Sequence, residues 1–178
     1  MDAQTVSALV DRYGEDVMRF CSRLSVSPAD AEDLYQQTFL KLMGLRVRLE
    51  EEQNPRAYLF SLANGIWKNE CRKRMRRAAI APSVSLDAGA VGRESAEDTQ
   101  GQVEKALCHQ ALARAVQQLE PKFRTPILLR YSFGMEISEI ARIEHLPQGT
   151  VKSRMNRAKR KLRREMEALG YGTESSSR

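Results

Sequence analysis

The sequence predicts an all-α protein with two small helical domains joined by a flexible linker, the second domain containing a helix-turn-helix. Apolar residues recur at helical spacing along most of the 178-residue chain, and no segment shows convincing strand alternation. Residues 80–101 are rich in Gly, Ser, Pro and acidic residues but poor in large apolar ones, as in a linker. Residues 137–163 have the pattern of two short helices about a tight turn.

The first domain, residues 1–79, is expected to hold three helices. An apolar stripe over residues 6–24 marks the first of them. The second should begin at Ser27-Pro28, where Ser can cap free amides and Pro fits the first turn. Gly44 is expected to end it.

The pair Asn54-Pro55 repeats this start signal. A third helix should therefore run from Pro55 towards Arg77. Its first turns are apolar on one side, and residues 72–77 are strongly basic. That basic end is a candidate surface for an anionic partner.

The second domain, residues 102–168, is expected to open with two helices, marked by apolar residues over 112–119 and 123–131. Pro126 removes a backbone donor, so the second of these helices should be kinked there or start late. Gly134 is expected to close it. After the domain, the polar residues 169–178 are expected to form a disordered tail.

The last predicted helix is densely basic on one face. An apolar stripe formed by Val151, Met155, Ala158 and Leu162 should pack inward. Residues 148–164 hold eight Lys or Arg residues and no acid, whereas a merely solvated helix usually interleaves both signs. A solvated cationic face stays the alternative, but the single sign favours a polyanion. The outward groups can meet phosphates and base edges, and they are Lys152, Ser153, Asn156, Arg157 and Arg160.

Composition agrees with a nucleic-acid partner, since the net charge is +6 and the pI is near 9.4. No apolar run approaches the about 20 residues that cross a bilayer, and the start lacks a signal peptide, so a cytoplasmic protein is expected. Cys21, Cys71 and Cys108 are far apart, which argues against a disulfide framework or a metal site. The lack of any catalytic motif predicts a non-enzymatic protein with no cofactor and no small-molecule substrate.

Three linked segments resemble the extracytoplasmic-function sigma factors, the smallest bacterial transcription-initiation sigma factors. The resemblance spans about residues 5–166, in the expected order. It implies a first domain that binds the polymerase clamp and the melted minus-10 element, and a second that binds the minus-35 duplex. It also implies core RNA polymerase, promoter DNA and an anti-sigma factor, commonly membrane-anchored, as partners. The segments are Asp30-Ala-Glu-Asp-Leu-Tyr-Gln-Gln-Thr-Phe, Arg56-Ala-Tyr-Leu-Phe with Arg72-Lys-Arg, and Glu139-Ile-Ala with Pro147-Gln-Gly-Thr-Val-Lys-Ser-Arg.

The resemblance assigns three sets of site residues. Clamp binding falls to Glu32, Asp33 and Gln36, although acids near a helix start are also explained by the helix dipole alone. Minus-10 DNA binding falls to Trp67, Lys68, Asn69, Arg72, Lys73 and Arg76, with Trp67 equally explained as a core residue. Minus-35 DNA binding falls to Thr150, Lys152, Ser153, Arg154, Asn156, Arg157 and Arg160.

The chain departs from the family pattern at several positions. His145 stands where the helix-turn-helix usually has Gly, so it should adopt a left-handed conformation. Glu136 replaces the usual Ser cap and should weaken the start of that helix. Gly65 and Asn69 align where the family usually has Asn and Asp. The base-capturing loop of the family corresponds to about residues 45–54.

These features predict an alternative sigma factor that joins core RNA polymerase and directs promoter recognition. An autonomous helix-turn-helix regulator is the first alternative, and it would bind duplex DNA without polymerase, usually as a dimer. A helical protein that sequesters a sigma factor is the second. The acidic and basic helices of the first domain favour the sigma factor over the regulator, and the basic recognition helix favours it over the sequestering protein.

Overall fold

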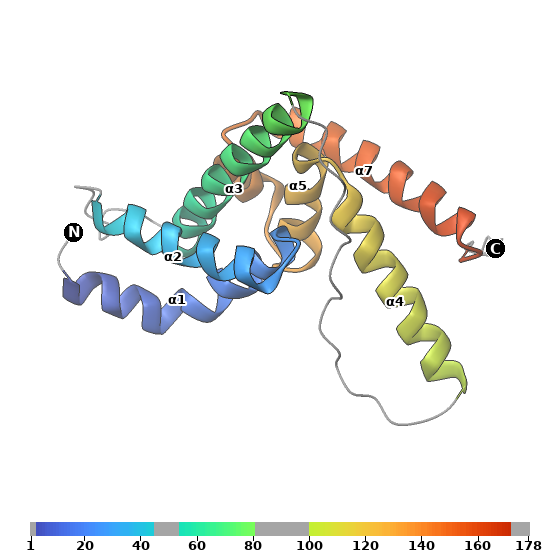
Figure 1. The fold of residues 1–178 in the computed structure, drawn as a ribbon, viewed down its shortest axis with the longest axis horizontal. Coiled ribbons are helices and arrows are strands. Elements are labelled where there is room, and N and C mark those ends of the chain that lie inside the picture. Colours follow the sequence, from blue (N-terminus) through green and yellow to red (C-terminus); the bar gives the residue numbers. More distant parts are fainter. Residues whose placement is uncertain (1–2, 45–53, 81–99, 172–178) are drawn as a thin grey trace.

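The computed structural model describes residues 3–44, 54–80 and 100–171, and within these ranges every regular element is an α-helix (Figure 1). The all-α prediction is therefore confirmed. Most of the predicted linker at 80–101 and of the loop at 45–54 lies outside the described residues. The helices are α1 (Ala3–Leu24), α2 (Pro28–Gly44), α3 (Pro55–Ile80), α4 (Gln100–Gln118), α5 (Pro121–Tyr131), α6 (Ile137–Glu144) and α7 (Gln148–Ala168).

Local capping sets the starts of α2 and α3 where the sequence predicts them. The backbone N–H of Asp30 donates to Ser27 Oγ at 3.1 Å. In the same way, the N–H of Ala57 donates to Asn54 Oδ1 at 3.0 Å. Each cap satisfies an amide that has no partner within its helix. The predicted end of α2 at Gly44 is also confirmed.

Two helix ends differ from what the sequence suggested. Of the two alternatives for α5, the late start is wrong, because Pro121 occupies the first turn of the helix and the helix continues through Pro126. The predicted tail also begins too early. The N–H of Tyr171 donates to the carbonyl of Met166 at 2.9 Å, so residues 169–171 form a closed turn at the end of α7. The rest of the tail lies outside the described residues.

The N-terminal helices α1–α3 and the C-terminal helices α4–α7 share one apolar core. Phe20 of α1 stacks on Phe60 of α3, with their ring centroids 4.6 Å apart. Phe133, between α5 and α6, meets both rings edge-on at 5.5 Å and 5.0 Å. The C-terminal helices are therefore seated on α1 and α3 by aromatic contacts.

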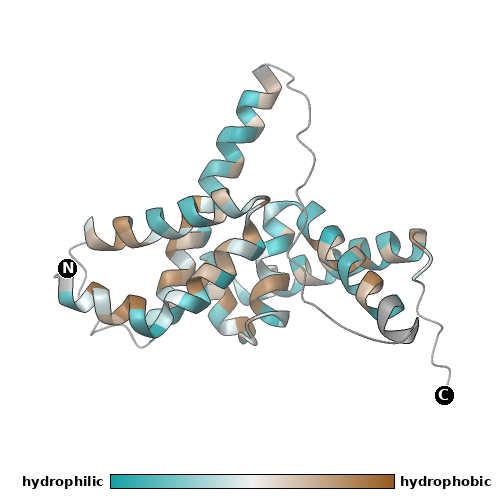
Figure 2. Ribbon diagram, turned by 60° about the horizontal axis from the view of Figure 1, so that its bottom comes forward, coloured by the Kyte–Doolittle hydropathy of each residue, from teal (hydrophilic) through white to brown (hydrophobic). Residues whose placement is uncertain are grey.

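Two helical segments extend away from this core. The C-terminal half of α3 projects from the rest of the molecule and is mainly hydrophilic (Figure 2). α4 lies beside α7 and reaches away from α1–α3 (Figure 1). None of the helices in the described parts of the chain is apolar and long enough to span a membrane.

Candidate polymerase and nucleic-acid interfaces

The basic face of α7 is anchored by a buried stripe on its opposite side. Val151, Met155 and Ala158 keep 5% or less of their surface exposed, which confirms their predicted inward orientation. Thr150 is half-buried, and its carbonyl accepts a hydrogen bond from Ser153 Oγ at 3.0 Å. The helix therefore offers one continuous polar surface to a ligand. Its exposed members are Lys152, Ser153, Asn156, Arg157 and Arg160.

The turn between α6 and α7 takes the conformation that the sequence predicts. His145 is left-handed, with φ 54° and ψ 48°, and its N–H bonds to the carbonyl of Arg142 at 3.2 Å. At the start of α6, the backbone N–H of Glu136 donates to Glu139 Oε2 at 2.9 Å. Glu139 thus supports the helix start that the replacement of Ser by Glu136 was expected to weaken.

The acidic face of α2 is exposed. Glu32, Asp33 and Gln36 all point away from the core, while the apolar residues on the other side of the helix are buried. The same face continues in two apolar residues that were not predicted to be exposed: Leu40 is 66% exposed and Met43 is 49% exposed. Leu40 follows Gln36 by four residues and Met43 follows Leu40 by three, and this helical spacing could have predicted that they share the face of Gln36. The surface therefore combines acids with two unpartnered apolar side chains, as protein interfaces often do.

A groove lined by α2 and α3 gathers four of the six residues predicted to bind minus-10 DNA. Gln37 contributes from α2, and the α3 side supplies most of the charge. Arg72 donates to Asn69 Oδ1 at 2.7 Å, which fixes two of these side chains relative to one another. The four are Asn69, Arg72, Lys73 and Arg76, and all are exposed.

The other two predicted minus-10 residues lie differently. Trp67 is only 7% exposed, and the guanidinium of Arg124 lies over its ring at 5.3 Å. This burial under Arg124 supports the interpretation of Trp67 as a core residue in this conformation, and its assignment to minus-10 DNA stays a prediction. Lys68 is half-buried and turns towards α6.

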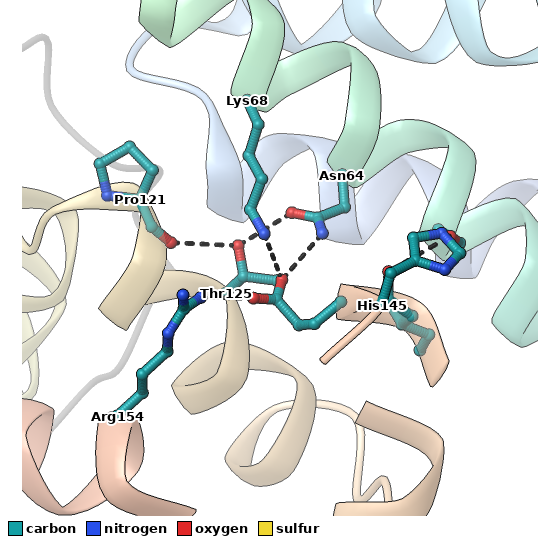
Figure 3. A network of polar contacts seen from close by, with 9 residues as sticks. Asn64, Lys68, Pro121, Thr125, His145 and Arg154 are labelled. Carbon is teal, nitrogen blue, oxygen red and sulfur yellow. Dashed lines mark hydrogen bonds and ion pairs between the residues drawn. The ribbon is translucent and has the colours of Figure 1, made fainter. Parts of the chain in front are cut away.

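Lys68 belongs to a polar cluster around the carboxylate of Glu144, which we call the Glu144 cluster (Figure 3). Glu144 is buried at the end of α6 and accepts hydrogen bonds from Asn64 Nδ2 and Lys68 Nζ, each at 2.8 Å. Arg154 of α7 lies 3.5 Å from the second carboxylate oxygen. Thr125 of α5 holds Asn64 in place by donating to its Oδ1 at 3.0 Å. A buried carboxylate requires such partners, because desolvation without them is costly.

Further hydrogen bonds flank the Glu144 cluster and join the same helices. Asn54 Nδ2 donates to Glu139 Oε1 at 2.9 Å. Ser61 Oγ donates to the carbonyl of Ile143 at 3.2 Å and lies equally far from His145 Nε2. The α6 end of the helix-turn-helix is therefore held on α3 by polar contacts along its length. No local pattern in the sequence predicts this contact.

A third polar contact between the two groups of helices involves Arg124 of α5. Its guanidinium is buried and donates to the carbonyl of Leu24, the last residue of α1, at 3.0 Å, and to the carbonyl of Leu119 at 3.2 Å. Burial lowers the pKa of Arg124 from its ordinary value. Within the described residues, no cluster of His, Cys, Asp and Glu is suited to hold a metal ion.

Known protein families match both groups of helices. The model of Sigma-70 region 2 matches residues 9–77, and that of Sigma-70 region 4 matches residues 109–162. The ECF RNA polymerase sigma factor SigL of Mycobacterium tuberculosis is 31% identical over 170 residues, covering 95% of this chain and 93% of SigL. SigW of Bacillus subtilis, also an ECF sigma factor, is 26% identical, covering 94% of this chain and 92% of its own length.

Solved structures show the same fold. The sigma factor RpoE of Bartonella quintana, in complex with the anti-sigma factor NepR, aligns with a TM-score of 0.75 at 23% identity and covers 93% of this chain and 98% of RpoE. CnrH, in complex with the cytosolic domain of CnrY, aligns with a TM-score of 0.60 at 23% identity and covers 94% of this chain and 90% of CnrH.

Proposed function

The chain belongs to the extracytoplasmic-function family of RNA polymerase sigma factors, and we propose that it recognises a two-part promoter through separate surfaces on α3 and α7. It is an alternative sigma factor that directs transcription initiation. The observation that carries the proposal is the two-sided character of α7, whose buried apolar stripe leaves exposed a basic face with no acid over residues 148–164. We assign residues 1–79 to a region-two domain and residues 102–168 to a region-four domain.

On this proposal, the exposed side of α2 binds the clamp of core polymerase. Glu32, Asp33 and Gln36 provide the polar contacts, and the exposed Leu40 and Met43 extend the surface. The charge of the acids orients the two proteins and raises their rate of association, whereas the apolar side chains supply the surface area that is buried in the interface. The two kinds of side chain on one helix face favour a protein partner over DNA.

The promoter contacts divide between the two domains. The groove between α2 and α3 takes minus-10 DNA against Asn69, Arg72, Lys73 and Arg76, where guanidinium and ammonium groups can pair with phosphates. The exposed face of α7 enters the major groove of the minus-35 duplex. Arg157 and Asn156 can make bidentate contacts to guanine and adenine edges, while the neighbouring basic side chains set the register on phosphates.

We further propose that an anti-sigma factor regulates the chain, as the structures of RpoE with NepR and of CnrH with CnrY suggest by analogy. The protein acts by binding rather than by catalysis. Because chromosomal promoters and RNA polymerase are its partners, its place of action is the cytoplasm.

Reconstituted transcription tests the proposal. Core polymerase alone and core polymerase with the chain are compared on genomic DNA fragments, and start sites are mapped. We expect initiation from a small set of promoters that depends on the chain, with the free chain binding these promoters weakly. Tight and specific duplex binding by the chain alone, with no effect on polymerase, supports the autonomous regulator instead.

A further inference from the structure

One buried carboxylate contacts two cationic side chains that the family resemblance assigns to promoter DNA. Lys68, assigned to minus-10 DNA, lies 2.8 Å from Glu144, and Arg154, assigned to minus-35 DNA, lies 3.5 Å from it. The Glu144 side chain is 0% exposed, whereas Lys68 and Arg154 keep 24% and 26% of their surface exposed. The carboxylate therefore pairs with two cationic side chains, as a DNA phosphate would.

Side chains on one face of α3 hold the end of α6, which carries this carboxylate. Ser61, Asn64 and Lys68 follow one another at spacings of three and four residues, so they share one face of the helix. The end of α6 lies on that face, and all three side chains contact it. The left-handed His145 ends α6 directly after Glu144 and turns the chain towards α7.

We propose that Glu144 is an autoinhibitory latch, which holds the region-four domain on α3 in the free chain and withholds Lys68 and Arg154 from promoter DNA until the two domains separate. This inference rests on the proposed function, because it extends the promoter-binding surfaces of that function to these two side chains. The contacts of the latch all come from the chain itself.

The charges explain why the latch opposes DNA binding in particular. In the latched state, the single negative charge of Glu144 is paired with the two cations Lys68 and Arg154. If Lys68 and Arg154 pair with DNA phosphates instead, Glu144 is left without its cationic partners and close to phosphates that are also negatively charged. Opening also uncovers Phe60 and Phe133, which adds an apolar cost. Apparent promoter affinity is then reduced by the fraction of molecules that are open.

The variant E144Q tests the latch, with E167Q as its matched control. Gln keeps the shape of the side chain and removes its charge, which leaves two cations unbalanced at the interface. Glu167 is an exposed glutamate on α7, so both variants raise the net charge by one and share any general gain in DNA attraction. Only E144Q removes charge from the Glu144 cluster.

Two measurements on the full chain report opening without DNA. Trp67 is the single tryptophan of the protein and lies under Arg124 of α5, so its emission reports separation of α5 from α3. Small-angle X-ray scattering reports the radius of gyration. We expect E144Q to shift the Trp67 emission to longer wavelength and to increase the radius of gyration, while E167Q matches the wild type.

Promoter affinity of the free chain is the third measurement. We expect E144Q to bind promoter DNA roughly tenfold more tightly than E167Q, the factor for a wild type in which about one molecule in ten is open. A second variant, S61Y, wedges the same interface with no change of charge and should open it too. Circular dichroism checks folding, and S61Y decides the matter if E144Q does not fold.

The proposal is overturned if E144Q and S61Y stay as compact as the wild type, or if E144Q and E167Q gain the same DNA affinity. Failure of the proposed function has a different signature. In that case neither the wild type nor any variant directs initiation by core polymerase, whatever the scattering and fluorescence show.

Discussion

Phe133 lies edge-on against Phe60, with ring centroids 5.0 Å apart and ring planes at 80°. This pair joins the segment between α5 and α6 to the second turn of α3. Arg56 covers both rings, with its guanidinium carbon 5.3 Å from one centroid and 5.9 Å from the other. Edge-to-face aromatic geometry adds to the free energy of simple burial. The pair is therefore the apolar counterpart of the Glu144 cluster in holding the two groups of helices together.

Replacement of Phe133 by Ala should destabilise the protein. Phe133 is 8% exposed, and truncation of a buried Phe costs about 3–5 kcal/mol of unfolding free energy. We expect a loss near the lower end of that range, about 3 kcal/mol, because separated domains can keep part of their own cores. Urea denaturation followed by circular dichroism measures it. Tyr131→Ala is the control, since Tyr131 is 61% exposed, and a similar loss for both variants contradicts the packing role of Phe133.

The helix starts could be predicted because their causes are local. Ser27 and Asn54 cap amides three residues further along, so the signal lies within one turn of the chain. The inward stripe of α7 follows from periodicity in the same way. These features depend on neighbours that the sequence itself places side by side.

The Glu144 cluster could not be predicted because its partners are remote. Asn64 and Lys68 lie 80 and 76 positions from Glu144 in the sequence. Composition describes Glu144 only as one more acid at the end of an amphipathic helix. Long-range packing also determines whether Trp67 is a core residue or a DNA-stacking residue, because these two interpretations differ only in what covers its ring. Local patterns cannot distinguish a core tryptophan from a stacking one.

Arg157→Ala should weaken recognition of the minus-35 element while leaving polymerase assembly intact. Arg157 is exposed on the face of α7 opposite its buried stripe. A lost bidentate contact to a base costs about 1–3 kcal/mol and relaxes specificity at one position. Holoenzyme binding to promoters with intact and altered minus-35 elements measures this. Arg164→Ala removes an exposed arginine near the end of the same helix, and an equal effect on all promoter sequences in both variants shows that Arg157 is not a base contact.

The buried thiol of Cys21 should make stability fall in alkali. Burial raises its pKa from 9.0 to about 12. Because the pKa is higher in the folded state, the unfolded thiol ionises first, so the contribution is fully present below pH 9 and is lost as the pH rises towards 12. Burial and the charge of the ionised Cys21 thiol also raise the pKa of Tyr35, so the difference between the wild type and Cys21→Ala reports the thiol together with its effect on Tyr35.

Melting temperatures at pH 8 and pH 11 measure this dependence. We expect the alkaline loss to be smaller in Cys21→Ala than in the wild type. Alkylation supplies an independent check, since Cys21 should react with iodoacetamide more slowly than the half-buried Cys108. Equal reaction rates for the two thiols contradict the burial argument.

Asp33→Arg should abolish assembly with core polymerase while the chain stays folded. Asp33 is exposed in the second turn of α2, between the capped start of the helix and the apolar Leu40 and Met43. Arg there reverses the charge that the proposed clamp contact requires, and like charges across an interface cost several kcal/mol. The substitution leaves the buried side of α2 unchanged, so helical content and melting temperature should match the wild type. Size-exclusion chromatography with core polymerase measures assembly.

Asp11→Arg is the matched control for this charge reversal, because Asp11 is an exposed acid on α1 and changes the net charge by the same amount. We expect Asp11→Arg to assemble and Asp33→Arg not to, with both chains equally helical. If the two variants assemble alike, clamp binding does not depend on this acidic face. If Leu40→Ser and Met43→Ser then block assembly while Asp33→Arg does not, the apolar end of α2 is the contact and the acids only keep it soluble.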